Sequence, residues 1–249
     1  MNILGIIPAR YGSTRFEGKP LALINGKMMI QRVYEQSKKA DRLLDVVVAT
    51  DDQRIFDAVT AFGGKAVMTS SSHKSGTDRC REVVEKIGSG FDAVINIQGD
   101  EPYINPLQIN QIAELISDED TQIASLCKPI HDLDELLSHN AVKVVIDKNG
   151  KALYFSRYTI PFQRNENDTS KWMDLRTYYR HVGIYAYKSL VLKEISALPQ
   201  SGLELSESLE QLRWLENGYS VRMGVTEFES YSVDVPDDIK KIESVFKNC

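Results

Sequence analysis

The chain has 249 residues, of which 42% are hydrophobic and 26% are charged, and its formal net charge is −5. These proportions are ordinary for a soluble globular protein and supply enough apolar residues for a sizeable core. The acidic balance argues against a nucleic-acid-binding protein, which needs a basic face to meet phosphates. It does not exclude a nucleotide substrate, because a few clustered cations can hold one triphosphate.

Nothing in the sequence predicts a membrane or a secreted protein. No apolar run approaches the roughly 20 residues that span a bilayer, and the opening MNILGIIPA lacks the basic region and cleavage site of a signal peptide. The three cysteines, Cys80, Cys127 and Cys249, are widely spaced and form no metal-binding pattern. We therefore expect three free thiols in a cytoplasmic protein.

Apolar runs alternate with helical patterns over the first half of the chain. The runs are typical of strands buried on both faces and cover residues 3–8, 45–50, 65–69 and 92–97. The helical patterns cover residues 28–39, 52–62, 75–88 and 106–116. This alternation predicts an α/β fold with a doubly wound, mainly parallel sheet, whose ligands bind at the C-terminal ends of the strands.

The second half is more mixed and predicts a smaller mixed sheet with some antiparallel strands. Its expected strands cover residues 122–130, 142–147, 151–157, 180–187 and 221–227. Helices are expected at 206–218 and 236–246, and the polar stretch 163–171 is expected to be exposed. Because no repeat or linker interrupts the chain, we expect a single domain over residues 1–249.

A basic, glycine-containing loop follows the first expected strand. The segment PARYGSTRFEGKP places Arg10, Arg15 and Lys19 among glycines, which let backbone amides approach a phosphate. The dinucleotide-binding pattern G-x-G-x-x-G is absent. A Walker A loop is also excluded, because five residues separate Gly12 from Gly18. Charge alone leaves a solvated basic loop open, but its place at the end of a parallel strand favours a phosphate site.

Several motifs together resemble the 3-deoxy-manno-octulosonate (KDO) cytidylyltransferase family. They are IIPARYGSTRFEGKPL, SGTDR, QGDEP, YFSR, RHVGIYAY, ESLEQLR and VDVPDD, and they extend over essentially the whole chain. The resemblance implies a sheet of the nucleotide-diphospho-sugar transferase type. It also implies transfer of CMP from CTP to the anomeric hydroxyl of an acidic eight-carbon sugar, with release of pyrophosphate, for lipopolysaccharide synthesis. Members are usually cytoplasmic homodimers that use Mg²⁺.

The resemblance assigns the nucleotide to two segments. In the first loop, the CTP phosphates are assigned to the backbone around Ala9 and to Arg10, Ser13 and Lys19; Arg15 has a weaker claim. In SGTDR, the assigned contacts are Ser75, Gly76 and Arg79. From the residues alone, this second segment is a helix start, with Ser75 or Thr77 as the cap and Asp78 in the first turn.

Two aspartates are implied as Mg²⁺ ligands. Asp100 in QGDEP is assigned to the metal, and its expected partner is Asp234 in VDVPDD. Similar sequences often have Thr before the proline, but here Val235 takes that place and cannot cap the helix that Pro236 begins. Asp234 therefore lacks an obvious structural role. Together with Arg10 and Lys19, the two acids form the expected catalytic set, and without a cation between them they are expected to repel each other.

The acceptor sugar needs a cation for its carboxylate and polar groups for its hydroxyls. Arg157 in YFSR offers a planar fork, and His181 and Tyr185 lie on one face of a strand as two donors. Taken alone, His181 is an ordinary strand histidine, and the side of the 206–218 helix opposite its leucine stripe is an ordinary solvated face. The resemblance assigns these residues to the sugar: Gln98, Arg157, His181, Tyr185, Glu210 and Gln211.

Two other functions remain open from the sequence. One is a related sugar-acid nucleotidyltransferase, such as a CMP-sialic acid synthetase. The other is a non-catalytic nucleotide-binding protein, against which the joint presence of Lys19, Asp100 and Asp234 argues. The segment 158–179 combines a polar tip with Trp172 and other interface-type residues. We expect it either to pack against a second copy of the chain or to cover the site as a flap.

Overall fold

The computed structural model describes residues 1–88 and 90–246, which form two compact units. The first unit comprises residues 1–114 together with the chain from 229 onward, and the second comprises Leu115–Phe228. A single domain over residues 1–249 stays a prediction. No helix among the described residues is long and apolar enough to cross a membrane.

The first unit contains a parallel sheet in the order β6-β1-β4-β5. Its strands are β1 (Ile3–Ala9), β4 (Asp45–Thr50), β5 (Ala66–Met68) and β6 (Ala93–Asn96). The chain proceeds from β1 to β4 and β5 on one side and then returns to β6 on the other side. This reversal places a topological switch point between β1 and β6, where α/β sheets bind ligands beyond the strand ends.

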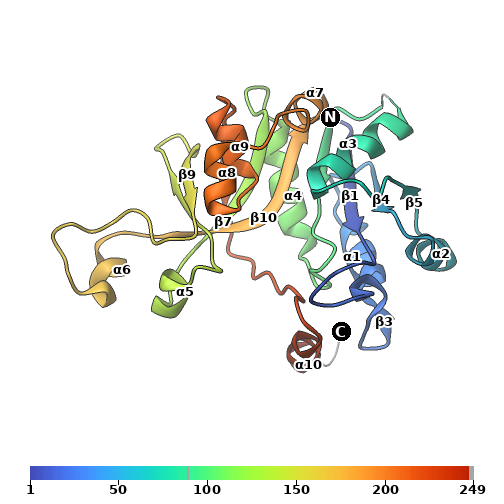
Figure 1. Cartoon of the computed structure of the whole chain (residues 1–249), viewed down its shortest axis with the longest axis horizontal. Helices are drawn as coiled ribbons and strands as arrows, with labels where there is room; N and C mark the ends of the chain where they lie inside the picture. Colours follow the sequence, from blue (N-terminus) through green and yellow to red (C-terminus); the bar gives the residue numbers. More distant parts are fainter. Residues whose placement is uncertain (89, 247–249) are drawn as a thin grey trace. The chain divides into compact units, whose positions relative to one another are not determined.

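Helices pack against this sheet at the positions that the sequence predicts (Figure 1). They are α1 (Met29–Ser37), α2 (Gln53–Ala61) and α3 (Gly76–Ile87). The unit also contains α10 (Pro236–Val245) and most of α4 (Pro106–Ser117). The loop after β1 is more ordered than expected. It contains a helical turn, η1 (Lys19–Leu21), and a hairpin of β2 (Leu23–Ile24) and β3 (Lys27–Met28), beside which α10 lies.

The second unit has the mixed strand pairing expected of it. Its strands are β7 (Ile123–Pro129), β8 (Lys143–Ile146), β9 (Ala152–Ser156), β10 (Tyr179–Lys188) and β11 (Val221–Val225). Strand β7 pairs in parallel with β11 and antiparallel with β10, and β8 pairs antiparallel with β10 and β9. Its short helices are η2 (Thr169–Lys171), α5 (Leu133–Leu137), α6 (Trp172–Leu175), α7 (Ser189–Ile195), α8 (Gly202–Glu207) and α9 (Gln211–Glu216).

The single helix predicted over 206–218 is wrong. Helix α8 ends at Glu207, Ser208 takes a left-handed backbone conformation with φ of 52°, and α9 begins at Gln211. A non-glycine residue in this region costs energy, so neighbouring contacts must maintain the break. The break also changes the buried face: Leu205 is 62% exposed, whereas Gln211, expected to point away from the core, is 4% exposed.

Two of the cysteines are described, and both are free, buried thiols. Burial raises the pKa of Cys127 to about 12, so this side chain stays a neutral thiol at physiological pH. Cys249 lies outside the described residues.

Candidate functional site

The loops after β1 and β6 meet at the switch point of the first unit. A Cβ atom added to Gly99 would lie 2.6 Å from the backbone oxygen of Pro8, a distance that no side chain tolerates. Glycine at this position therefore lets the QGDEP loop pass over the end of β1. In the other loop, Gly18 has a φ of 69° and its N–H donates to Tyr11 O at 3.0 Å. Gly99 thus permits the close approach of the two loops, whereas Gly18 permits a left-handed turn within the first loop.

Lys19 and Asp100, which the resemblance assigns to the phosphates and to the metal, are in direct contact. Lys19 Nζ donates to Asp100 Oδ2 at 2.8 Å and to Val233 O at 2.8 Å. The backbone N–H of Val233 also donates to Asp100 O at 2.9 Å. The side chains of Lys19 and Asp100 are 17% and 29% exposed, so this ion pair is only partly solvated. Sequence reasoning missed the Val233 carbonyl, because a backbone acceptor leaves no signal in residue identity.

Asp234 follows Val233 and is therefore brought next to Asp100 by the same backbone contact. Its Oδ1 lies 3.1 Å from Arg15 Nη2, and both side chains are largely exposed. Val235 is the N-cap residue of α10, as predicted, and Asp238 Oδ2 accepts the free N–H groups of Asp234 and Val235. The carboxylate of Asp234 is therefore not used as a helix cap. Arg15, whose expected claim to the phosphates is weaker, thus contacts an expected metal ligand.

The helix start predicted for SGTDR is confirmed in detail. Ser75 Oγ accepts the N–H of Asp78 at 3.1 Å, and Asp78 Oδ2 accepts the N–H of Ser75 at 3.3 Å. Arg79, however, does not lie on the exposed side of α3, because it is only 5% exposed. Its guanidinium donates to Thr69 Oγ1 at 2.5 Å and to Asp51 Oδ2 at 3.1 Å. Arg79 thus joins the segments that follow β4 and β5.

The other assigned residues of the first unit surround the same strand ends. Ala9 is buried at the last position of β1, Arg10 is exposed directly after it, and Ser13 and Gln98 are partly exposed. Ser13 Oγ accepts a long hydrogen bond of 3.4 Å from the N–H of Phe16. An additional contact, not predicted, places the Arg54 guanidinium 3.3 Å from the centre of the Tyr11 ring.

In the second unit, Arg157 is held by backbone carbonyls. Its Nε donates to Glu207 O at 2.7 Å, and its two terminal nitrogens donate to His139 O and Ser208 O, each at 3.3 Å. The Glu207 carboxylate accepts the N–H of Arg157 at 2.9 Å. These bonds stabilise the helix break, because Arg157 binds the carbonyls of the last residue of α8 and of Ser208, the left-handed residue that follows it. Glu210 and Gln211 follow that junction directly.

His181 and Tyr185 lie together on β10, with ring centres 5.2 Å apart, although a β-bulge separates them. Ser125 Oγ donates to Ile184 O at 2.8 Å and contacts His181 Nε2 at 2.9 Å. Since the hydroxyl has one proton, Nε2 carries the hydrogen of the ring and Nδ1 is an acceptor. Burial holds the pKa of His181 well below its ordinary value, so the ring is neutral. The sequence analysis expected His181 to donate to the sugar, but Nε2–H is used by Ser125, which leaves Nδ1 as an acceptor.

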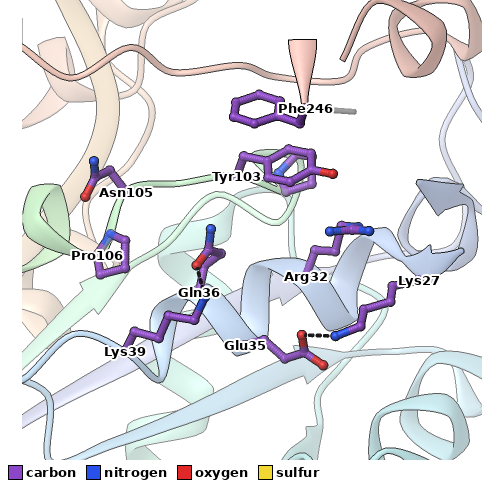
Figure 2. Close-up of a pocket in the computed structure, with 10 residues that line it drawn as sticks. Lys27, Arg32, Glu35, Gln36, Lys39, Tyr103, Asn105, Pro106 and Phe246 are labelled. Atoms are coloured by element: carbon purple, nitrogen blue, oxygen red, sulfur yellow. Dashed lines mark hydrogen bonds and ion pairs between the residues drawn. The ribbon is translucent and has the colours of Figure 1, made fainter. Parts of the chain in front are cut away.

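The structure also contains two hollows that the assigned residues do not line. One, of about 530 Å³, lies in the first unit and is lined by Lys27, Arg32, Lys39, Tyr103 and Phe246, among others (Figure 2). The other, of about 320 Å³, lies in the second unit beside Tyr158, Phe162 and Trp172. Within residues 1–88 and 90–246, no group of three or more His, Cys, Asp or Glu side chains is arranged to hold a metal.

Comparison with known proteins identifies the family. The profile of the cytidylyltransferase family matches residues 4–235. A 3-deoxy-manno-octulosonate cytidylyltransferase from Bacteroides thetaiotaomicron is 58% identical over 100% of this chain and 99% of the relative. The chain belongs to the cytidylyltransferase family. The enzyme of the same name from Cytophaga hutchinsonii is 49% identical over 97% of this chain and 96% of its own length.

Solved structures give the same result for the fold of this cytidylyltransferase. A structure of CMP:2-keto-3-deoxy-manno-octonic acid synthetase complexed with CTP is 42% identical, with a TM-score of 0.92 over 99% of each chain. A putative glucose-1-phosphate thymidylyltransferase from Bacillus anthracis is 17% identical, with a TM-score of 0.64 over 99% of this chain and 96% of its own, and shares the fold alone. The predicted nucleotide-diphospho-sugar transferase type of α/β fold is confirmed.

Proposed function

We propose that this cytidylyltransferase transfers CMP from CTP to the anomeric hydroxyl of KDO. The hydroxyl oxygen forms a bond to the α-phosphorus, the bond from that phosphorus to the β-phosphate oxygen breaks, and pyrophosphate leaves. The hydroxyl proton passes to solvent. The observation that carries the proposal is the contact of Lys19 with Asp100 and Val233 at the switch point, in a chain of this family. Phosphoryl transfer depends on such positioning and charge neutralisation.

Lys19 is placed to hold the phosphates. Among the described residues, two of its three N–H donors are used by Asp100 and Val233, which leaves a third for a phosphate oxygen. Arg10 is exposed after β1, beside Ala9, whose backbone we assign to the same phosphates. Ser13 is their further partner, and Ser75 and Gly76 contact the nucleotide at the start of α3. Because Arg79 is buried, we assign it an indirect role: its hydrogen bonds to Asp51 and Thr69 support the loops around the nucleotide.

Asp100 and Asp234 suit Mg²⁺. Carboxylate oxygens are its preferred protein ligands, and the Val233–Asp100 backbone bond joins the two segments that carry them. In this structure Asp100 is paired with Lys19 and Asp234 with Arg15, so a cation compensates the charge of each carboxylate. When bound, Mg²⁺ neutralises phosphate charge and lowers the proton affinity of the attacking hydroxyl. The expected magnesium cofactor stays a proposal.

The second unit supplies the proposed sugar contacts. Arg157 has five N–H groups, of which three donate to described carbonyls. One N–H remains on each terminal nitrogen, which is the fork that a carboxylate accepts. The sugar hydroxyls are assigned to the neutral His181 and Tyr185, and to Gln98, Glu210 and Gln211.

Arg157→Lys is expected to raise the Michaelis constant for the sugar about tenfold or more, with less change in that for CTP. Lysine keeps the charge but loses both the fork and the carbonyl bonds that brace the α8–α9 junction. Steady-state kinetics with each substrate varied in turn measures the two constants. Arg164→Lys, in the polar connection after β9, is the matched control and should behave as wild type. A loss confined to the CTP constant would contradict the assignment.

We further propose a homodimer that uses the connection between β9 and β10. Trp172 and Tyr178, expected at the interface, are instead buried in a cluster with Ile130 and Leu136. Other apolar side chains of the same segment are exposed: Tyr158 by 69%, Phe162 by 70% and Leu175 by 60%. Large apolar side chains exposed on one segment are typical of interfaces.

The double change Phe162→Ser and Leu175→Ser is expected to convert a dimer into a monomer. Loss of two large apolar side chains from an interface core removes several kcal/mol of association energy, on the order of 2–4. Light scattering at micromolar concentration measures the mass. The control, Leu190→Ser, removes a side chain that is 79% exposed on α7 and should leave the mass unchanged. A monomeric wild-type protein contradicts the dimer.

The product and location follow from the substrates. CMP-KDO is an activated sugar for lipopolysaccharide, and CTP is a cytoplasmic nucleotide, so we place the enzyme in the cytoplasm. Pyrophosphate release with CTP, Mg²⁺ and KDO tests the function. Release with N-acetylneuraminate in place of KDO would support the sialic acid alternative instead. Binding of CTP without release from either sugar would support a non-catalytic protein.

A further inference from the structure

A network of side chains connects the two chain segments that carry the proposed metal ligands, Asp100 and Asp234. Tyr103 follows Asp100 by three residues in the loop after β6, and Val233 directly precedes Asp234. Tyr103 is 9% exposed and Val233 is fully buried. Both belong to one buried apolar cluster, which also contains Ile24, Met29 and Ile242. The two segments that carry the acids are therefore anchored in the same buried apolar cluster.

Asn25 joins these segments through its side-chain amide. Its Nδ2 donates to Tyr103 Oη at 2.9 Å and to Phe246 O at 3.0 Å. Its backbone N–H donates to Glu243 Oε1 at 2.8 Å. The rings of Tyr103 and Phe246 stack with centres 3.9 Å apart and an angle of 9° between their planes (Figure 2). One amide thus links the loop of Asp100 to the end of α10, the helix that follows Asp234.

Asn25 is itself held from the opposite side. Arg32, which is 9% exposed, donates to Ile24 O at 2.6 Å and to Asn25 O at 2.9 Å. Its guanidinium carbon lies 5.0 Å from the centre of the Tyr103 ring, on which it stacks as a cation (Figure 2). Asn25 and Gly26 have φ of 44° and 77°, as a two-residue hairpin turn requires. The position of the amide is therefore fixed before any substrate binds.

We propose that Asn25 is a positioning residue that sets the spacing of Asp100 and Asp234 for Mg²⁺. The proposal rests on the metal role of these acids given above. Mg²⁺ demands nearly ideal octahedral geometry, so a small displacement of one ligand weakens binding. Lys19 also joins the two segments, but its ammonium is the group that we assign to the CTP phosphates. Among the described residues, Asn25 donates its hydrogen bonds to Glu243, Tyr103 and Phe246 and not to either acid, so the bridge holds the spacing without using a metal ligand.

Asn25→Gly tests the bridge, because glycine keeps the left-handed turn and the N–H to Glu243 while removing the amide. The Mg²⁺ concentration that gives half-maximal rate is expected to rise about tenfold, as for other residues that support metal ligands. The Michaelis constant for the sugar should change by less than about twofold. Without sugar, titration calorimetry should show CTP binding weakened about tenfold with Mg²⁺ present and unchanged in EDTA.

Tyr103→Phe is the second variant, since it keeps the ring stack and removes only the Oη acceptor. It should shift the Mg²⁺ dependence in the same direction by a smaller factor, and adding it to Asn25→Gly should cause no further loss, because both remove the same bond. Lys39→Ala, on the hollow of Figure 2 but without a contact to Asn25, is the control and should match wild type.

A purely structural role predicts a different result. It lowers the melting temperature of both variants but leaves Mg²⁺ dependence and CTP affinity at 25 °C unchanged, because these report the native state alone. That result overturns the proposal for Asn25 provided that Asp100→Asn and Asp234→Asn abolish the Mg²⁺-dependent part of CTP binding. If the two aspartate variants keep the Mg²⁺-dependent part of CTP binding, neither acid is a metal ligand. The proposal for Asn25, which rests on that role, is then also wrong.

Discussion

Asp100→Asn and Asp234→Asn are each expected to reduce kcat by a factor of about 100 or more, at least ~2.7 kcal/mol of transition-state stabilisation. An amide keeps the size of the carboxylate but carries no charge for the metal. Each variant should also lose most of the rise in melting temperature that Mg²⁺ and CTP together give the wild type, because that rise reflects binding to the native state. Pyrophosphate release and thermal unfolding measure the two effects.

The structure changes the stability expected of these variants. From the sequence, removal of one of two repelling carboxylates would leave stability unchanged or raise it. In the structure, Asp100 instead pairs with Lys19 and Asp234 with Arg15. Asparagine still offers an oxygen to Lys19, so Asp100→Asn should cost no more than about 1 kcal/mol without ligands. Asp234 is half exposed, and its replacement should leave stability nearly unchanged.

Asp237→Asn is the matched control for both aspartates. Its side chain is 82% exposed in the first turn of α10, and its pairing with Lys240 is solvated. Activity and the ligand-induced rise in melting temperature should both equal those of wild type. Neither Asp100 nor Asp234 is a metal ligand if their asparagine variants retain turnover and that rise in melting temperature.

Lys19→Ala is expected to reduce kcat by a factor of about 100 to 1,000, because it removes the cation that meets the phosphates. The change also leaves Asp100 Oδ2 and Val233 O without their ammonium donor, so a stability loss of about 1 kcal/mol should accompany it. The fold itself should persist, because Lys19 contributes no apolar packing to the sheet.

The control for Lys19 is Lys27→Ala. Lys27 is an exposed lysine of the same unit whose ammonium pairs with Glu35 at 2.6 Å, away from the strand ends of β1 and β6. Rate measurements on folded protein, well below the melting temperature, separate the loss of the phosphate contact from the loss of stability. Wild-type turnover in folded Lys19→Ala would exclude the first loop from the mechanism.

The order of strands and helices in the first unit could be predicted because each strand is a continuous apolar run. Residues such as Ile6, Val47 and Ile95 are fully or almost fully buried, and only a parallel sheet covered on both faces buries such runs. The capping of α3 by Ser75 could be predicted for a similar reason, since the cap and its partner Asp78 lie three residues apart. The β2–β3 hairpin was missed, although Asn25-Gly26 is a turn signal.

The sequence suggests the residues of the candidate site but not the contacts between them. The resemblance assigns Lys19, Asp100 and Asp234 to that site. The contacts that join their segments are the ion pair between Lys19 and Asp100, 81 residues apart, and the backbone hydrogen bond from Val233 to Asp100. A carbonyl oxygen is present at every position of the chain, so residue identity says nothing about which one will accept a bond.

By itself the sequence determined the α/β alternation, the loops that carry the polar side chains and the aspartate that is free of a capping role, because these depend on local periodicity and short spacings. The tertiary structure alone decided that Arg79 is buried, that Arg157 braces a broken helix and that Asn25 connects two distant loops. Each of these depends on which backbone carbonyl or distant side chain lies within about 3 Å of a donor. That proximity arises from packing over the whole chain, which no local pattern encodes.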